Sequence, residues 1–287
     1  SDSLSLALPR LFELPLAGQM VGAFDWRREG EQLRVRSGRI RVVNEDAHGE
    51  AMLSVGVQPG QVPELRLAAE IYDGNGANAS RYIPLRRLPD GLAGWLGQAL
   101  QDGHLNRGQL LYQGPVKIDP DRQQDRTFQM RYQGDDIVLS LLPDWPLARD
   151  VSADVFINGR EVRGVASKGT IYGSSVEQVY VDVPAFTTQE GPRLVVSGQL
   201  AGPLADLDSL MQDTPLKKML PEELLDWRMQ AGSMKGRLLL DFPFKREAGG
   251  SPTVIIDATV EGAELDNPER RLAVSDLKAP VYFHLHK

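Results

Sequence analysis

The sequence contains no cysteine, so neither a disulfide nor a thiolate nucleophile is available to it. It also contains no apolar run of about 18 or more residues, so we expect no membrane span within it. Positive charge is scarce: 32 Lys and Arg stand against 39 Asp and Glu, for a net charge of -7. Nucleic-acid-binding proteins need a basic surface for the phosphates, so that class of partner is not expected.

The two ends of the sequence predict a piece of a longer protein. It begins Ser1-Asp2-Ser3-Leu4, without an initiator methionine or a signal-peptide pattern, and its last residues, 281–287, have the pattern of a strand. The composition, 41% hydrophobic and 25% charged, is typical of a folded protein. We therefore expect residues 1–287 to be a piece of a longer protein, so that an anchor or targeting segment can lie outside it.

Most of the sequence alternates between apolar and polar residues, which is typical of strands with one buried face. The clearest stretches run over residues 151–157, 179–185, 194–200 and 254–260. Asn158-Gly159 predicts a tight hairpin, and Gln133-Gly134-Asp135-Asp136 predicts a second turn. Together these patterns predict roughly 15–18 short antiparallel strands.

Helical patterns are few and short. They are expected over Leu92–Leu100, Leu204–Met211, Lys217–Met219 and Glu222–Met229. They do not alternate with strands, which excludes a Rossmann or TIM-barrel fold. The predicted fold class is mainly β, with a few short helices.

One part of the sequence is echoed 128 residues later. Arg107-Gly108-Gln-Leu-Leu-Tyr-Gln-Gly-Pro115 is answered by Lys235-Gly236-Arg-Leu-Leu-Leu-Asp-Phe-Pro243, and positions 108 and 236, like 115 and 243, keep the same offset. In both copies a helical pattern precedes the basic residue. We interpret the echo as a duplicated helix-to-hairpin unit.

Motifs that carry chemistry are weak throughout. The Gly- and Asn-rich run 74–79 has no βαβ context for a dinucleotide, and Pro84 stands where a calcium loop starting at Asp73 needs its glutamate. His284 and His286 share a strand face, but a zinc site needs more ligands. No serine-nucleophile elbow occurs. We expect no catalytic residues, no metal and no cofactor.

Several motifs in residues 81–245 match, in order, those of one protein family. They are Arg81-Tyr-Ile-Pro84, Leu92-Ala-Gly-Trp95-Leu96, Leu110-Leu-Tyr-Gln-Gly114-Pro115, Pro143-Asp-Trp145-Pro146, Leu200-Ala-Gly202-Pro203, Thr214-Pro-Leu216 and Gly236-Arg-Leu-Leu-Leu-Asp-Phe242-Pro243. With these motifs the sequence resembles the YhdP branch of the AsmA-like proteins of Gram-negative bacteria. It departs from the family at Gly114-Pro115-Val116, where a Phe-Pro-Phe turn is usual.

The resemblance implies that residues 1–287 form a single elongated segment of a periplasmic protein, which is anchored in the inner membrane by a helix outside this segment. It further implies that the segment is a curled antiparallel β-sheet that forms an apolar groove. It implies transport of phospholipid acyl chains between inner and outer membranes, support of the outer-membrane permeability barrier, and no enzymatic activity or cofactor. Other envelope proteins are conceivable partners. The alternation by itself fits a closed core between two sheet layers as well as it fits a groove.

Candidate groove residues follow from the alternating stretches combined with this resemblance. The expected lipid-binding residues are Val155, Ile157, Val181, Val183, Leu194, Val196, Val254 and Ile256. Trp95 and Leu96, on the apolar face of the first predicted helix, are expected to cap the groove. The alternative is a non-enzymatic scaffold or assembly module of the cell envelope with a closed β core.

Overall fold

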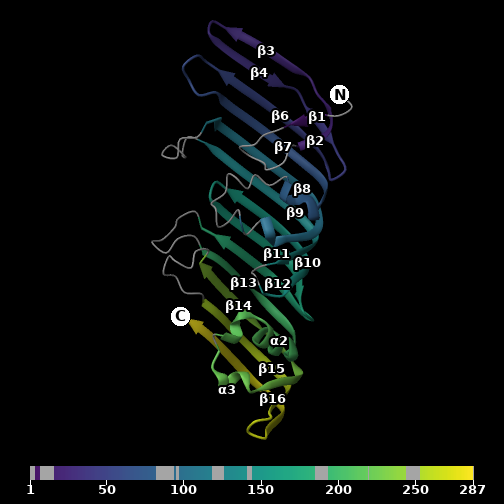
Figure 1. Cartoon of the computed structure of the whole chain (residues 1–287), viewed down its shortest axis with the longest axis vertical. Coiled ribbons are helices and arrows are strands. Elements are labelled where there is room, and N and C mark those ends of the chain that lie inside the picture. Colours follow the sequence, from purple (N-terminus) through teal and green to yellow (C-terminus); the bar gives the residue numbers. More distant parts are fainter. Residues whose placement is uncertain are drawn as a thin grey trace. The chain divides into compact units, whose positions relative to one another are not determined.

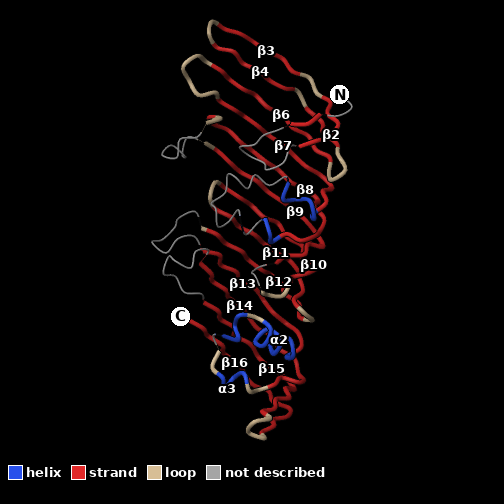
Figure 2. Tube along the Cα trace, in the orientation of Figure 1, coloured by secondary structure: helices blue, strands red, loops and turns tan. Residues whose placement is uncertain are grey.

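The structure, a computed structural model, describes residues 4–6, 16–81, 94, 97–117, 126–140, 144–184, 193–218, 220–243 and 253–286. Strands dominate these residues, and helices occur in the connections between strands (Figure 2). The strands are β1 (Leu4–Leu6), β2 (Leu16–Val21), β3 (Phe24–Glu29), β4 (Gln32–Ser37), β5 (Ile40–Val43), β6 (His48–Val57), β7 (Glu64–Asn75), β8 (Leu100–Pro115), β9 (Thr127–Ser140), β10 (Leu147–Asn158), β11 (Glu161–Ile171), β12 (Ser174–Val183), β13 (Arg193–Pro203), β14 (Arg228–Pro243), β15 (Thr253–Asn267) and β16 (Leu272–His286). The helical segments are η1 (Gly76–Arg81), α2 (Leu204–Asp213), η4 (Pro215–Lys218) and α3 (Glu222–Leu225).

The strands form one antiparallel sheet that does not close on itself. Its hydrogen-bonded order is β1-β2-β5-β6 and then follows the sequence to β16, while β3 joins through β4 to β6 (Figure 1). This confirms the predicted mainly β class with a few short helices. The chain divides into two compact units, residues 1–97, 102–135 and 154–162 (unit 1) and residues 98–101, 136–153 and 163–287 (unit 2).

The first hairpin of unit 1 is made of two interrupted strands. β2 pairs with β5 and β3 pairs with β4, and the interruptions fall at residues 22–23 and 38–39. At Gly22 a Cβ would lie 3.0 Å from the Ile40 side chain, so this close approach favours glycine. The Gly38 amide donates to the carbonyl of Ala23 at 2.9 Å, which holds the two breaks together.

The sequence echo corresponds to a structural repeat. β8 and β14 have 16 residues each, and both ends of β14 lie 128 residues after those of β8 (100 and 228, 115 and 243). β7 pairs with β8 and β13 pairs with β14, and in each pair a segment containing helical turns connects the two strands. Both echoed glycines lie in close quarters. A Cβ at Gly236 would lie 2.3 Å from a backbone oxygen, which excludes a side chain, and one at Gly108 would lie 3.2 Å from the Tyr132 ring, a tight contact.

Local predictions succeeded where no longer-range pairing competed with them. Asn158 and Gly159 form the predicted hairpin, with Gly159 at φ +61°. The helix expected from Leu204 is α2, and η4 lies near the turn expected at 217–219. Of the described residues of the first predicted helix, Gly94 and residues 97–99 are helical, whereas Leu100 already begins strand β8.

Two local predictions are wrong. The turn expected at residues 133–136 lies inside the continuous strand β9, where Asp136 adopts φ 52°, a conformation that aspartate tolerates within an irregular strand. The helix expected to reach Met229 ends at Leu225, since β14 begins at Arg228. Arg228 pairs with Asp266 of β15, and this sheet pairing overrides the local helical pattern.

Candidate functional site

In unit 2 the apolar residues of successive strands lie side by side on one face of the sheet. Directly paired residues of antiparallel strands project to the same face. Val181 pairs with Val196, Val196 with Leu240, and Leu240 with Val254, which gives one apolar row across four strands. In the next row, Leu238 pairs with Ile256. The register therefore brings Val181, Val196, Val254 and Ile256 onto one face, which we call the apolar face of unit 2.

All six predicted residues of unit 2 belong to this face, because Val183 and Leu194 are two residues from Val181 and Val196 on the same strands. Val183 and Leu194 are 3% exposed, Val196 7%, Val254 1% and Ile256 2%, while Val181 is half-buried. In unit 1, Ile157 is 2% exposed and Val155 half-buried. Trp95 and Leu96 lie outside the described residues.

Helix α2 covers one end of the apolar face of unit 2. It contacts β14, over which it lies in Figure 1, and its inward residues Leu207 and Met211 are buried. Met234 and Val260, a cross-strand pair at this end of the face, are 5% and 3% exposed. The buried residues of α2 recur at i and i+4, the spacing that places apolar side chains on one side of a helix. The helix and the sheet thus bury each other's apolar surface.

Unit 1 has an apolar face of its own, built by the same register rule. Its rows run Val35–Val55–Leu65, Leu53–Leu67–Tyr112 and Ala51–Ala69–Leu110. These nine side chains are intermediate in exposure, neither buried nor fully exposed. We call this surface the apolar face of unit 1. It differs from that of unit 2 in remaining partly open to solvent.

The apolar face of unit 1 continues onto strand β3. Trp26 pairs with Val35 and so extends the row of Val55 and Leu65 by one more strand. Trp26 is 82% exposed and Phe24, on the same side of β3, is 58% exposed. Exposure of the apolar row therefore rises toward β3.

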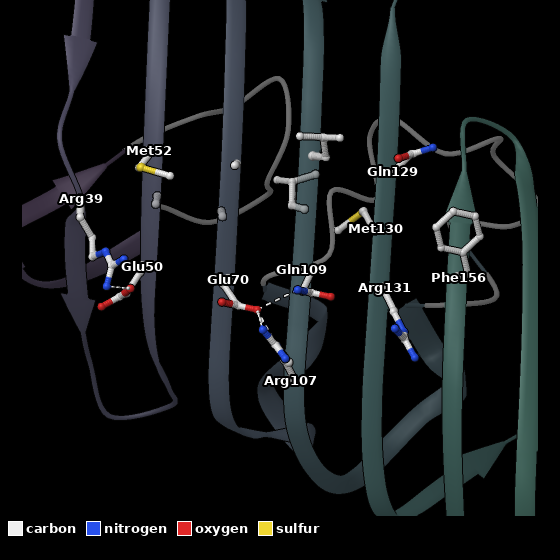
Figure 3. A pocket seen from close by; sticks show the side chains of 15 residues that line it. Arg39, Glu50, Met52, Glu70, Arg107, Gln109, Gln129, Met130, Arg131 and Phe156 are labelled. Carbon is white, nitrogen blue, oxygen red and sulfur yellow. Dashed lines mark hydrogen bonds and ion pairs between the residues drawn. The ribbon is translucent and has the colours of Figure 1, made fainter.

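The opposite face of unit 1 is polar, and the arginines around the hollow drawn in Figure 3 are paired with carboxylates. Glu50 accepts from Arg41 at 3.2 Å and lies 3.2 Å from Arg39, and Glu70 forms an ion pair with Arg107. Arg39, Glu50, Glu70 and Arg107 line a shallow hollow of about 500 Å³. The exposed apolar residues Met52, Leu111 and Phe156 line it as well. Its ion pairs cross from strand to strand and stabilise the register that aligns the apolar rows on the other face.

Two carboxylates in this ladder have shifted pKa values. The Tyr72 hydroxyl, with Arg107 and Gln109, donates to Glu70 and lowers its pKa despite partial burial. Arg131 lowers the pKa of Asp154 in the same way. Both groups are therefore held ionised, Glu70 in a pairing between β7 and β8 and Asp154 in one between β9 and β10.

The described residues show no group of three or more His, Asp or Glu side chains able to hold a metal ion. His284, considered above for metal binding, lies 2.8 Å from Asp257 on the polar face of β15. Across the same described ranges, no helix has the length and apolarity to cross a membrane.

The prediction missed the apolar face of unit 1. Leu53, Leu65 and Leu67 carry the same alternation as the predicted residues, and both of their strands were recognisable from the sequence. What alternation could not reveal was the pairing of β6 with β7 that sets their side chains in common rows.

The comparisons with known proteins agree with this architecture. A model of the YhdP protein family matches residues 1–286. The chain belongs to the YhdP family. The intermembrane phospholipid transporter YhdP of Escherichia coli (strain K12) is 25% identical to it over 189 residues, which are 64% of this chain and 14% of that relative. No solved structure matches the chain.

The resemblance proposed from the sequence motifs is thus confirmed at the level of the family. The matched relative is named as a lipid transporter and not as an enzyme. The chain therefore corresponds to a small part of that relative's length.

Proposed function

We propose that this chain is a periplasmic segment of a non-enzymatic bridge protein that carries phospholipid acyl chains between the inner and outer membranes. The observation that carries the proposal is the set of apolar rows aligned by strand register on one face in each unit. Acyl chains gain about 0.8 kcal/mol for each CH₂ group removed from water, so a continuous apolar surface suits them as cargo. The YhdP family membership supports phospholipid as the lipid class.

In this proposal the acyl chains contact Val155, Ile157, Val181, Val183, Leu194, Val196, Val254 and Ile256, together with the half-buried rows of unit 1 around Leu67. Trp95 and Leu96 cap the groove. Both units belong to one lipid-carrying segment of a longer protein whose own anchor holds it in the inner membrane. The unit 1 rows are accessible without rearrangement, whereas lipid reaches the buried rows of unit 2 when their cover moves aside.

Photocrosslinking at neighbouring residues tests the proposal most directly. Leu67 and Ala68 are adjacent on β7 and project to opposite faces, as do Val196 and Ser197 on β13. Crosslinkers at Leu67 and Val196 should capture phospholipid in cells, and those at Ala68 and Ser197 should not. Equal capture from both faces, or no phospholipid at either apolar position, contradicts lipid carriage.

A scaffold module with a closed β core is the second candidate. It is favoured by the near-complete burial of Val254 and Ile256, which leaves no open surface at those positions. A scaffold predicts that Leu67→Asp, if the chain still folds, leaves the envelope permeability barrier intact. Lipid carriage predicts that the same folded variant weakens the barrier, so one strain distinguishes the two functions.

A further inference from the structure

The polar face of unit 1 has a second hollow, of about 400 Å³, over strands β4, β6 and β7. Its floor is formed by Ser54 and Gly56 of β6. Nothing lies within 4 Å of a Cβ built on Gly56, so the space above that residue is open. The hollow is therefore wide enough for a small group to reach the sheet itself.

Three arginines surround this floor. Arg36 and Arg66 pair with Ser54 from its two sides, and Arg34 pairs with Gly56. Within the described part of the chain none of these guanidinium groups has a hydrogen bond or ion pair, and Glu64 is the one carboxylate of the lining. The lining therefore carries an excess of positive charge in a chain whose net charge is -7.

The neighbouring hollow of Figure 3 has no such excess of positive charge. There Arg39, Arg107 and Arg131 each lie against a carboxylate, so the local charge is neutralised. Both hollows lie on the same polar face of unit 1. A general need to solubilise the sheet would not leave three cations unpartnered in one hollow alone.

We propose that this hollow binds a phosphate group. Arg36 on β4 and Arg66 on β7 lie on either side of β6, so their backbones are about 10 Å apart. Two arginine side chains are long enough to meet across that distance. Two guanidinium forks then donate paired hydrogen bonds to the phosphate oxygens over Ser54. The Ser54 hydroxyl, which has no partner among the described residues, donates from below. Arg34 adds a third positive charge at the open end.

This site is separate from the acyl-chain surface. Ser54 and Arg66 alternate with Leu53 and Leu65, so the phosphate site and the apolar face of unit 1 lie on opposite sides of the sheet. A lipid lying on the apolar face cannot place its own phosphate there. The phosphate comes either from a small phosphate ester in solution or from headgroups of a lipid surface facing the polar side.

Titration of the whole chain with glycerol 3-phosphate, and flotation with phosphatidylcholine vesicles with and without phosphatidylglycerol, separate these sources. Arg36→Gln with Arg66→Gln should weaken binding about 100-fold, at about tenfold for each charged hydrogen-bonding group. The matched control is Arg160→Gln with Arg237→Gln, which removes the same charge from exposed positions that have no hydrogen bond or ion pair among the described residues. The control should bind as the unchanged chain does.

Loss of glycerol 3-phosphate binding in the test variant alone identifies a soluble ligand. Loss of binding to phosphatidylglycerol vesicles alone identifies a headgroup. The proposal is overturned if the unchanged chain binds neither probe, or if test and control variants weaken binding equally. Because the test and control variants leave the apolar face unchanged, failure here leaves lipid carriage untouched.

A second variant keeps every arginine in place. Gly56→Asp puts a carboxylate on the open floor, whereas Gly56→Asn puts a neutral side chain of the same shape there. If charge governs the site, the aspartate variant loses about tenfold more affinity than the asparagine variant. Equal affinity in the two variants overturns the phosphate assignment.

Discussion

The two units present the same kind of apolar row with different cover. In unit 1 the row of Leu53, Leu67 and Tyr112 is half-buried, and exposure rises toward Trp26. In unit 2 the row of Val196 and Val254 is buried, and α2 lies over one end of that face. Alternation determines which face of a strand is apolar, but covering elements determine how much of that face solvent or a ligand can reach.

The largest effect should come from a charge placed in the buried row. Val254→Asp puts a carboxylate at a position 1% exposed, and an unpaired charge there should lower the free energy of unfolding by about 4 kcal/mol or more. Thr259→Asp, exposed on the other face of β15, is the control and should have little effect. Urea unfolding measures both, and equal effects would mean that the face is not buried in solution.

The next effect should come from loosening the cover. Met211→Ala truncates a buried residue of α2 and should lower the free energy of unfolding by about 2–3 kcal/mol. This loosening should expose more of the apolar face of unit 2, which should then bind more of a fluorescent hydrophobic probe. Asp213→Ala, exposed on the same helix, should change neither measurement. Unchanged probe binding in the Met211→Ala variant would show that α2 does not shield the apolar face of unit 2 from solvent.

A charge in the open row should affect binding more than folding. Leu67→Asp should lower the free energy of unfolding by about 1–2 kcal/mol, since its side chain is only half-buried. Phospholipid recovered with the purified chain, measured by mass spectrometry, should fall in this variant and stay unchanged in Ala68→Asp. A loss of stability as large as that of Val254→Asp would erase the distinction between the units.

The smallest expected effect is on the stability of the fold at acidic pH. The pKa values of Glu70 and Asp154 are lowered in the folded state, so folding favours their ionised forms. Their contribution is complete above the pKa of the unfolded chain and is lost as the pH falls through that value toward the folded one. Glu70→Gln should reduce the loss of stability between neutral and acidic pH by less than about 1 kcal/mol. An unchanged pH dependence would remove Glu70 from the stabilising network.

The sequence was sufficient for the strands and for most of the site in unit 2. Apolar alternation identified Val181, Val196 and Val254 separately, and the register joined them into one row. Alternation could not reveal that the Gly134–Asp136 region continues a strand, because the glycine and aspartates that favour turns also suit an irregular strand. Nor could it reveal the unpaired arginines over Ser54, which come together only through the pairing of β4, β6 and β7.

The repeat bears on how such a protein changes length. The 128-residue offset separates β8 from β14 by six strands, an even number. Insertion or deletion of one whole 128-residue repeat leaves every later strand running in its original direction. It also keeps the apolar side chains of those strands on the same face of the sheet. Evolution, or a protein engineer, can therefore adjust the reach of the sheet in fixed increments without redesigning a single neighbouring pair.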